Sequence, residues 1–153
     1  MSSKHRMVFL AGLVCTVAAF TSGVATAQGS GSPCTLLTQA QIDAALGATV
    51  GAGQAIGTTG CSWTAPGQPK NMTVTVSLWP PNGFGTMPPM PGLTKTELGG
   101  VGDGAFYATI AGLTSLSVKK GNKVFVLHLY GVPGDARQMA VEKTLAAEVL
   151  ARL

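Results

Sequence analysis

Two cysteines, Cys34 and Cys61, enclose a short segment of the chain and constrain its fold more than any other feature of the sequence. A third cysteine, Cys15, lies in an N-terminal apolar run that we expect to be removed on export. Two cysteines in an exported domain allow only one internal pairing, so we predict a Cys34–Cys61 disulfide in preference to two buried free thiols. In the chain-entropy model, closing a loop of this length stabilises a fold by roughly 3–4 kcal/mol.

The expectation of export comes from the N-terminus, where residues 1–27 have the pattern of a secretory signal peptide. Basic residues at 4–6 precede an apolar run, Met7–Phe20, that is too short for a membrane-spanning helix. Small residues then occupy the positions that determine cleavage. Cys15 is surrounded by apolar sequence, which is not the pattern of a lipid-attachment cysteine. We therefore expect a secreted or periplasmic protein, with no membrane span after cleavage near Ala27.

The chain that remains after cleavage is long enough for one domain with a single core. Residues 28–32 form a Gly/Ser leader that we expect to be flexible, and residues 33–153 form the domain. The formal net charge of +4 falls to +2 once Lys4 and Arg6 are removed. No cluster of basic residues is large enough to favour nucleic-acid binding.

A short helix is predicted between the two cysteines. Thr38 and Gln41 have the spacing of a capping box, and Leu37 and Ile42 flank them as a hydrophobic staple. Gly47 can supply the left-handed residue that ends the helix. A helix of this length is not stable alone, so we expect the disulfide and the sheet to hold it.

A second helix is predicted over residues 136–151, which are strong helix formers, with Asp135 as its cap and Gln138 as the partner of that cap. Its apolar residues form one stripe that should lie on the sheet. Glu142 falls inside this stripe by angle. We favour an edge position for Glu142 over a functional buried acid, because an unpaired buried carboxylate is costly and an acid near a helix start suits the helix dipole.

Alternating apolar and polar residues predict five strands. Gly121-Asn122, between two such segments, predicts a β-hairpin with Ser115 opposite His128. The predicted strands cover residues 61–64, 72–79, 105–110, 113–120 and 123–130. We therefore predict an α+β fold, in which an antiparallel sheet of about four to five strands carries the N- and C-terminal helices packed on one face.

The face of this sheet opposite the helices, here called the open face, is predicted to be rich in hydroxyl groups, with a few aromatic residues and almost no charge. An antiparallel sheet can leave one face to water, so the open face is the expected contact surface. Its candidate binding residues are Trp79, Tyr107, Ser115, His128 and Tyr130.

The proline-rich stretch Pro80–Gly104 has the least regular pattern in the chain. Prolines at 88, 89 and 91 exclude an ordinary helix interior, so we predict a long loop. Packing of its methionines on the edge of the core, or disorder, is the favoured interpretation. A ligand-facing role for Met87–Pro91 is the alternative.

Four segments, residues 33–38, 45–47, 61–63 and 100–107, resemble small exported bacterial proteins, many of them lipoproteins of unknown function. Those proteins share a Cys-x-Leu-Leu helix, a later Cys-x-Trp strand and a Gly-x-Gly-Asp-x-Ala-aromatic turn. The resemblance covers most of the domain and implies a disulfide and a helix-plus-sheet fold, with no catalytic residues to carry over. This chain lacks the lipid-attachment cysteine, and it is proline-rich where such proteins tend to be helical.

Several kinds of chemistry are disfavoured by the residues themselves. After processing only one histidine, His128, remains, and the acids are scattered, so we predict no metal site and no cofactor. Ser115 opposite His128 is the one candidate for nucleophilic catalysis, but no acid occupies a neighbouring position to orient the imidazole. A hydroxyl–imidazole contact on a polar sheet face is the simpler interpretation.

Three functional hypotheses remain. The leading one is a non-enzymatic exported domain that binds a protein or glycan of the cell envelope through the open face. The second is a small secreted hydrolase, or an enzyme accessory factor, that uses Ser115 and His128. The third is a secreted inhibitor or interaction module that acts through the Met87–Pro91 loop.

Overall fold

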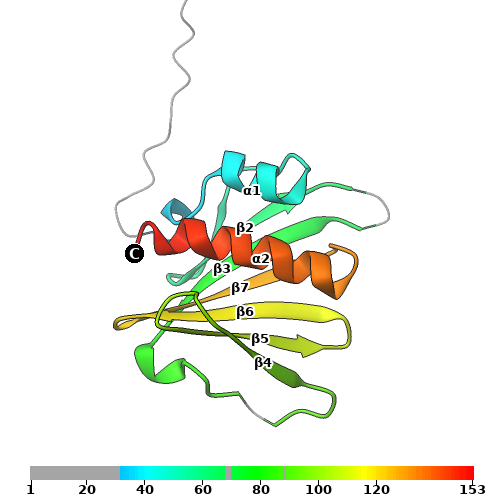
Figure 1. The fold of residues 1–153 in the computed structure, drawn as a ribbon. Helices are drawn as coiled ribbons and strands as arrows, with labels where there is room; N and C mark the ends of the chain where they lie inside the picture. Colours follow the sequence, from blue (N-terminus) through cyan, green and yellow to red (C-terminus); the bar gives the residue numbers. More distant parts are fainter. Residues whose placement is uncertain (1–31, 68–69, 88) are drawn as a thin grey trace, which may run out of the picture.

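Residues 32–67, 70–87 and 89–153 are described by the computed structural model, and over these ranges the chain forms a seven-stranded antiparallel sheet with two α-helices (Figure 1). The predicted signal peptide, Cys15 and residues 28–31 of the predicted leader lie outside them. Ser32 lies within them and caps a short 3-10 helix, η1 (Pro33–Thr35), where its Oγ accepts a hydrogen bond from the Cys34 N–H at 3.3 Å.

The strands run in the spatial order β1-β2-β3-β7-β6-β5-β4, and every neighbouring pair is antiparallel. The predicted hairpin register is confirmed, with Ser115 opposite His128 and Leu116 opposite Leu127. Three predicted strands, β3, β6 and β7, have the predicted bounds. The strands are β1 (Gln54–Ile56), β2 (Gly60–Ala65), β3 (Met72–Trp79), β4 (Thr94–Leu98), β5 (Gly104–Ile110), β6 (Leu113–Lys120) and β7 (Lys123–Tyr130).

The prediction of four to five strands is wrong, because the described residues contain seven. The two additional strands are β1 and β4, which lie at the two edges of the sheet. All residues of β1 are exposed, and in β4 only Leu98 is partly covered. Strands with so little buried surface carry no apolar alternation, so backbone pairing to β2 and β5 is what makes them strands. The predicted loop Pro80–Gly104 therefore contains β4 and a short 3-10 helix, η2 (Pro81–Gly83).

The helix between the cysteines, α1 (Gln39–Leu46), forms as predicted. Thr38 and Gln41 make both hydrogen bonds of the capping box, and Gly47 ends the helix in the left-handed conformation, with φ of 68°. Cys34 and Cys61 form a disulfide with their Cα atoms 5.0 Å apart. The bond joins η1 to β2 and so holds the segment that contains α1 against the sheet.

The C-terminal helix α2 (Asp135–Leu150) begins one residue before the predicted range, and its predicted cap is wrong. Gly134 occupies the cap position, and no side chain caps the helix there. Gln138, the expected partner of that cap, is buried instead. Its side chain accepts hydrogen bonds from the Thr114 N–H and hydroxyl at 3.1 and 3.0 Å, and it donates to two backbone carbonyls. These bonds fix the start of α2 to β6 and to the loop before the helix.

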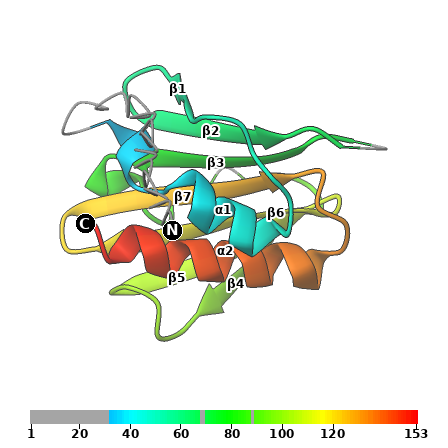
Figure 2. The ribbon, with the colours of Figure 1, turned by 90° about the horizontal axis from the view of Figure 1, so that it is seen from above.

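Both helices lie on the same side of the sheet, as the view from above shows (Figure 2). Ile42 and Leu46 of α1 and Leu145 of α2 join one core with Leu116 and Leu127 of the sheet, and all five are at most 2% exposed. Burying a leucine or isoleucine side chain fully is worth about 1.5–3 kcal/mol, so this layer contributes strongly to stability. The two-layer α+β arrangement is therefore confirmed.

Glu142 has no exposed surface, so the predicted edge position for this residue is wrong. It lies in the stripe of α2 that faces the sheet, between the buried residues Val141 and Leu145. The strand and helix surfaces around it leave no route for the short carboxylate to reach water. The angle of Glu142 on the helix had indicated this buried position. The edge position was favoured because burying a carboxylate is costly, and that argument did not hold.

A candidate binding pocket on the open face

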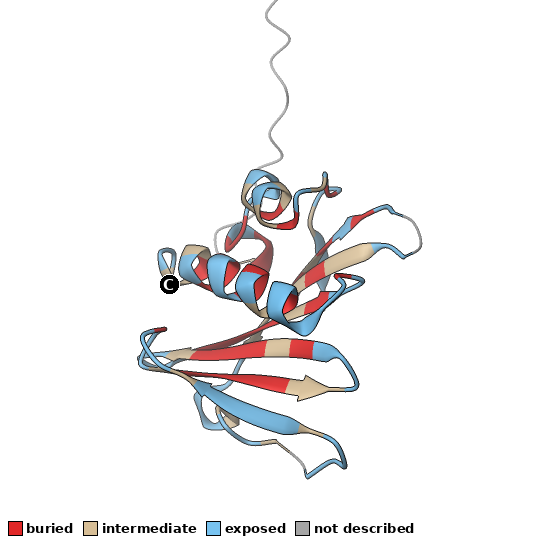
Figure 3. Ribbon diagram, turned by 45° about the vertical axis from the view of Figure 1, so that its right-hand side comes forward, coloured by how far each residue is buried: buried red, intermediate tan, exposed pale blue. Residues whose placement is uncertain are grey.

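The open face is divided into two halves with different surroundings. On the half formed by β1, β2 and β3, the hydroxyl residues are exposed or partly exposed, and two pairs of hydroxyl groups lie 3.3 and 3.4 Å apart across strands. On the half formed by β5, β6 and β7, Phe106, Ala108, Ser117 and Val126 are buried although both helices lie on the other face (Figure 3). Another part of the chain must therefore cover this half.

The cover is formed by residues 81–87 and 89–93, here called the covering segment. It leaves β3 at Pro80, passes through η2, and returns to the edge strand β4. The rings of Phe84 and Phe106 pack with centroids 5.4 Å apart. Gly104 allows this approach, because a Cβ atom there would lie 3.3 Å from the Phe84 ring. The proline-rich stretch is thus anchored to β5 by an aromatic pair.

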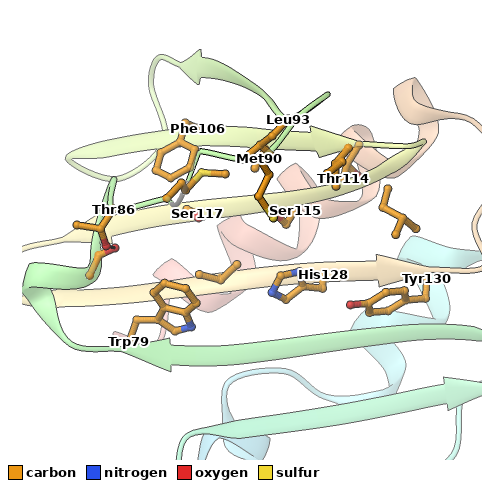
Figure 4. Close-up of a pocket in the computed structure, with 16 residues that line it drawn as sticks. Trp79, Thr86, Met90, Leu93, Phe106, Thr114, Ser115, Ser117, His128 and Tyr130 are labelled. Carbon is orange, nitrogen blue, oxygen red and sulfur yellow. Dashed lines mark hydrogen bonds between the residues drawn. The ribbon is translucent and has the colours of Figure 1, made fainter.

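A pocket of about 320 Å³ lies between the covering segment and the sheet (Figure 4). Its floor comes from β5, β6 and β7, one wall is Trp79 at the end of β3, and Met87, Met90 and Leu93 close it from the covering segment. Most of the lining is apolar. The apolar residues are Trp79, Met87, Met90, Leu93, Phe106, Ala108, Ile110, Leu113, Val126 and Tyr130.

The polar groups of the floor are concentrated on β6 and β7. Ser115 and His128 are directly opposed across these strands, and Ser117 is the next residue of β6 on the same face. The rings of His128 and Tyr130 stack with centroids 6.4 Å apart. Burial lowers the pKa of His128 below its ordinary value, so the imidazole is neutral at pH 7.

Four of the five predicted binding residues line this pocket, namely Trp79, Ser115, His128 and Tyr130. Trp79 and Tyr130 are 43% and 47% exposed, so they form its outer rim. Ser115 and His128 lie on the floor. The structure therefore brings residues of β3, β6 and β7 together in one site.

Tyr107 does not belong to this group, and its predicted position on the open face is wrong. It pairs with Leu116, points to the helix side, and is 6% exposed. Its hydroxyl donates a hydrogen bond to the Met139 carbonyl of α2 at 2.7 Å. The sequence interpretation placed Tyr107 outward, which by alternation turns Phe106 inward. The structure reverses them, because α2 supplies an acceptor for the tyrosine and the covering segment supplies a partner for the phenylalanine.

The residues that sequence reasoning missed come mainly from the covering segment. Met87, Met90 and Leu93 showed no periodic pattern, and the alternative of a ligand-facing Met87–Pro91 loop pointed to the two methionines but not to Leu93. That alternative fits their position, since Met87 and Met90 close the pocket. Pro88, within the same predicted loop, lies outside the described residues.

The surroundings of Ser115 and His128 differ from those of a Ser-His catalytic pair. The residues that line it include no Asp, Glu, Lys or Arg, so no carboxylate orients His128. Ser115 lies within a regular strand and not on a sharp turn that would expose its hydroxyl. Among the described residues, no side-chain hydrogen bond joins Ser115 to His128, and no group of three His, Cys, Asp or Glu side chains could hold a metal ion.

Comparison of the chain with protein-family models, with curated proteins and with solved structures gave no match. Over the described ranges, no helix combines the length and apolar character needed to cross a bilayer. The pocket itself is therefore the basis for assigning a function.

Proposed function

We propose that this chain is an exported, non-enzymatic binding domain whose binding site is the pocket beneath the covering segment. The observation that carries the proposal is the gathering of Trp79, Ser115, His128 and Tyr130 around one cavity, which the covering segment closes. Pockets with apolar walls and a few converging polar groups are the usual form of small-molecule sites.

The proposed site of action is the cell envelope, after removal of residues 1–27. The Cys34–Cys61 disulfide supports it, because such bonds persist in oxidising compartments. The resemblance to small exported bacterial proteins and lipoproteins supports the same location. The proposed partner is a protein or glycan of the envelope, which either supplies the ligand or presents it to the pocket.

The hydrolase hypothesis is the second candidate, and one observation favours it. Ser115 and His128 are opposed on adjacent strands inside a pocket. The missing carboxylate and the strand position of Ser115 weigh against it. Replacing His128 with Ala separates the two proposals, because an enzyme would lose turnover almost completely while a binding site would lose affinity only in part.

The third hypothesis, interaction through the Met87–Pro91 loop, merges with the first. Met87 and Met90 both line the pocket, so removing the tip of this loop should open it. We expect a loop deletion to reduce retention of any pocket ligand. If every ligand and partner stays bound after the deletion, neither the loop nor the pocket is the binding site.

The binding proposal is tested by filling the pocket. Ala108 on β5 is 8% exposed and lies in the floor, so Ala108→Phe should occupy the cavity. Thr64→Phe is the matched control, because it adds the same ring on the exposed half of the open face. The oxidised domain, each variant and small-molecule extracts of envelopes would be incubated together, and retained compounds identified by mass spectrometry. A compound held by the control and lost from Ala108→Phe supports the proposal, and equal retention by both contradicts it.

A further inference from the structure

We propose that the pocket takes a neutral, mainly apolar molecule of about ten non-hydrogen atoms with one hydrogen-bonding group. Medium-chain alcohols and simple phenols have this chemistry. The inference rests on the proposed function, and it adds the size, the charge and the orientation of the ligand.

The size follows from the cavity. A volume of about 320 Å³ lies at the lower end of the range for small-molecule sites. At about 30 Å³ for each water-sized group, the pocket holds roughly ten of them. A chain of eight carbons with a terminal hydroxyl fits this volume, and a full-length phospholipid chain exceeds it.

The charge follows from the lining, which includes no Asp, Glu, Lys or Arg side chain. His128 is neutral, because its burial lowers its pKa. The Lys95 ammonium lies 4.3 Å from the centroid of the Phe106 ring, and it is paired with the Glu97 carboxylate at 2.8 Å. A buried carboxylate or ammonium group on the ligand would lose water without gaining an opposite charge, so a neutral ligand is favoured.

The orientation follows from where the polar groups lie. Ser115, Ser117 and His128 are together on the floor, and the covering segment above them contributes thioethers and a leucine. A neutral imidazole offers one donor and one acceptor, and each serine hydroxyl offers both, so a ligand hydroxyl can be satisfied in either role. The apolar body then lies against Met87 and Met90, whose flexible side chains adapt to different shapes.

The test compares two ligands of equal length that differ in charge. Octan-1-ol and octanoate would be titrated at pH 7.5 into the oxidised domain, with tryptophan emission and calorimetry as the two readouts. Trp79 lines the pocket, whereas Trp63 is 2% exposed in the core and serves as an internal reference. We expect octan-1-ol to bind at least about tenfold more tightly than octanoate.

Two variants make the result specific to the pocket. Ala108→Phe should abolish octan-1-ol binding, while Thr64→Phe should leave it unchanged. Met90→Lys places a cation at the pocket on a side chain that is 47% exposed, so it should fold normally and raise octanoate affinity relative to octan-1-ol. Met90→Lys keeps the test valid if Ala108→Phe fails to fold.

The outcomes separate the two proposals. The inference is supported if octan-1-ol binds tenfold more tightly than octanoate and if Ala108→Phe abolishes octan-1-ol binding. Equal binding of both ligands, or binding of neither by a domain that still retains an extract compound through the pocket, overturns the ligand class and leaves the binding function standing. No ligand binding together with no pocket-dependent retention overturns both. An unchanged alcohol-to-carboxylate ratio in Met90→Lys also contradicts the inference.

Discussion

Glu142 lies in the core with no exposed surface, and within the described structure neither of its carboxylate oxygens has a hydrogen-bond partner. The nearby Thr114 hydroxyl donates to Gln138 at 3.0 Å instead. Thr114 and the Leu129 N–H act to lower the pKa of Glu142, but the effect of burial is larger. Burial consequently raises the pKa of Glu142 to about 8, and the side chain is a protonated acid at neutral pH.

This residue makes the stability of the domain pH-dependent. The pKa in the folded state, about 8, exceeds the ordinary value of 4.5, so the folded state holds a proton that the unfolded state releases. The contribution is fully present below pH 4.5 and is lost as the pH rises through 8, on the order of 1 kcal/mol per pH unit. Glu142→Gln should remove this slope, as urea unfolding between pH 5 and 9 would measure. The exposed Glu97→Gln is the control, and an unchanged slope in Glu142→Gln would contradict the assignment.

Tyr107 gives a second prediction at the same scale. Tyr107→Phe removes the hydrogen bond to the Met139 carbonyl of α2. It should lower the free energy of unfolding by about 1–2 kcal/mol, because a hydrogen bond between the sheet and the helix is lost. Since the ring points away from the pocket, octan-1-ol affinity should stay the same. His128→Leu is the counterpart and should weaken octan-1-ol binding. The idea fails if Tyr107→Phe changes affinity as much as His128→Leu does.

At the scale of elements, an aromatic contact joins the covering segment to the sheet. Phe84 packs on Phe106 with ring centroids 5.4 Å apart, and a Cβ atom at Gly104 would lie 3.3 Å from the Phe84 ring. The segment between η2 and β4 makes few backbone hydrogen bonds to the sheet. Side-chain packing therefore decides whether it lies on the open face.

Phe84→Ala should release the covering segment. We expect the free energy of unfolding to fall by about 1–3 kcal/mol. Octan-1-ol affinity should fall as well, because one side of the pocket is no longer held in place. Ile56→Ala removes an apolar side chain that is 51% exposed on β1 and serves as the control. Hydrogen exchange of residues 84–93 should rise in Phe84→Ala alone. Unchanged exchange there would show that the segment is held by other contacts.

At the scale of the whole molecule, the predictable parts are those with one buried face. β3, β6, β7 and α1 were predicted because alternation, a Gly-Asn turn and a capping box each leave a local pattern. β1 and β4 have almost no buried surface, so their sequences show no alternation of apolar and polar residues that would predict their pairing. The faces of β5 were interchanged because both Phe106 and Tyr107 are buried, each by a different distant segment. Contacts of that kind depend on tertiary packing, which periodicity does not record.

The disulfide and the pocket are at different ends of this architecture, and that separation is itself testable. Cys34 and Cys61 join η1 to β2, whereas the pocket lies over β5, β6 and β7 on the other face. Replacing both cysteines with Ala should lower the free energy of unfolding by roughly 3–4 kcal/mol, mainly by freeing the unfolded chain. Within the folded molecules, octan-1-ol affinity should remain within about twofold of the wild type.

Urea unfolding measures the first effect, and calorimetric titration below the unfolding transition measures the second. Removing the bond should loosen α1 and β1 first, because α1 is too short to be stable alone and β1, an edge strand, has β2 as its one partner within the described residues. Hydrogen exchange should therefore rise in residues 34–62 and stay low in β6 and β7. A parallel loss of affinity would show that the two halves of the sheet are coupled. Retained affinity would show that the disulfide stabilises the frame while the covering segment alone completes the pocket.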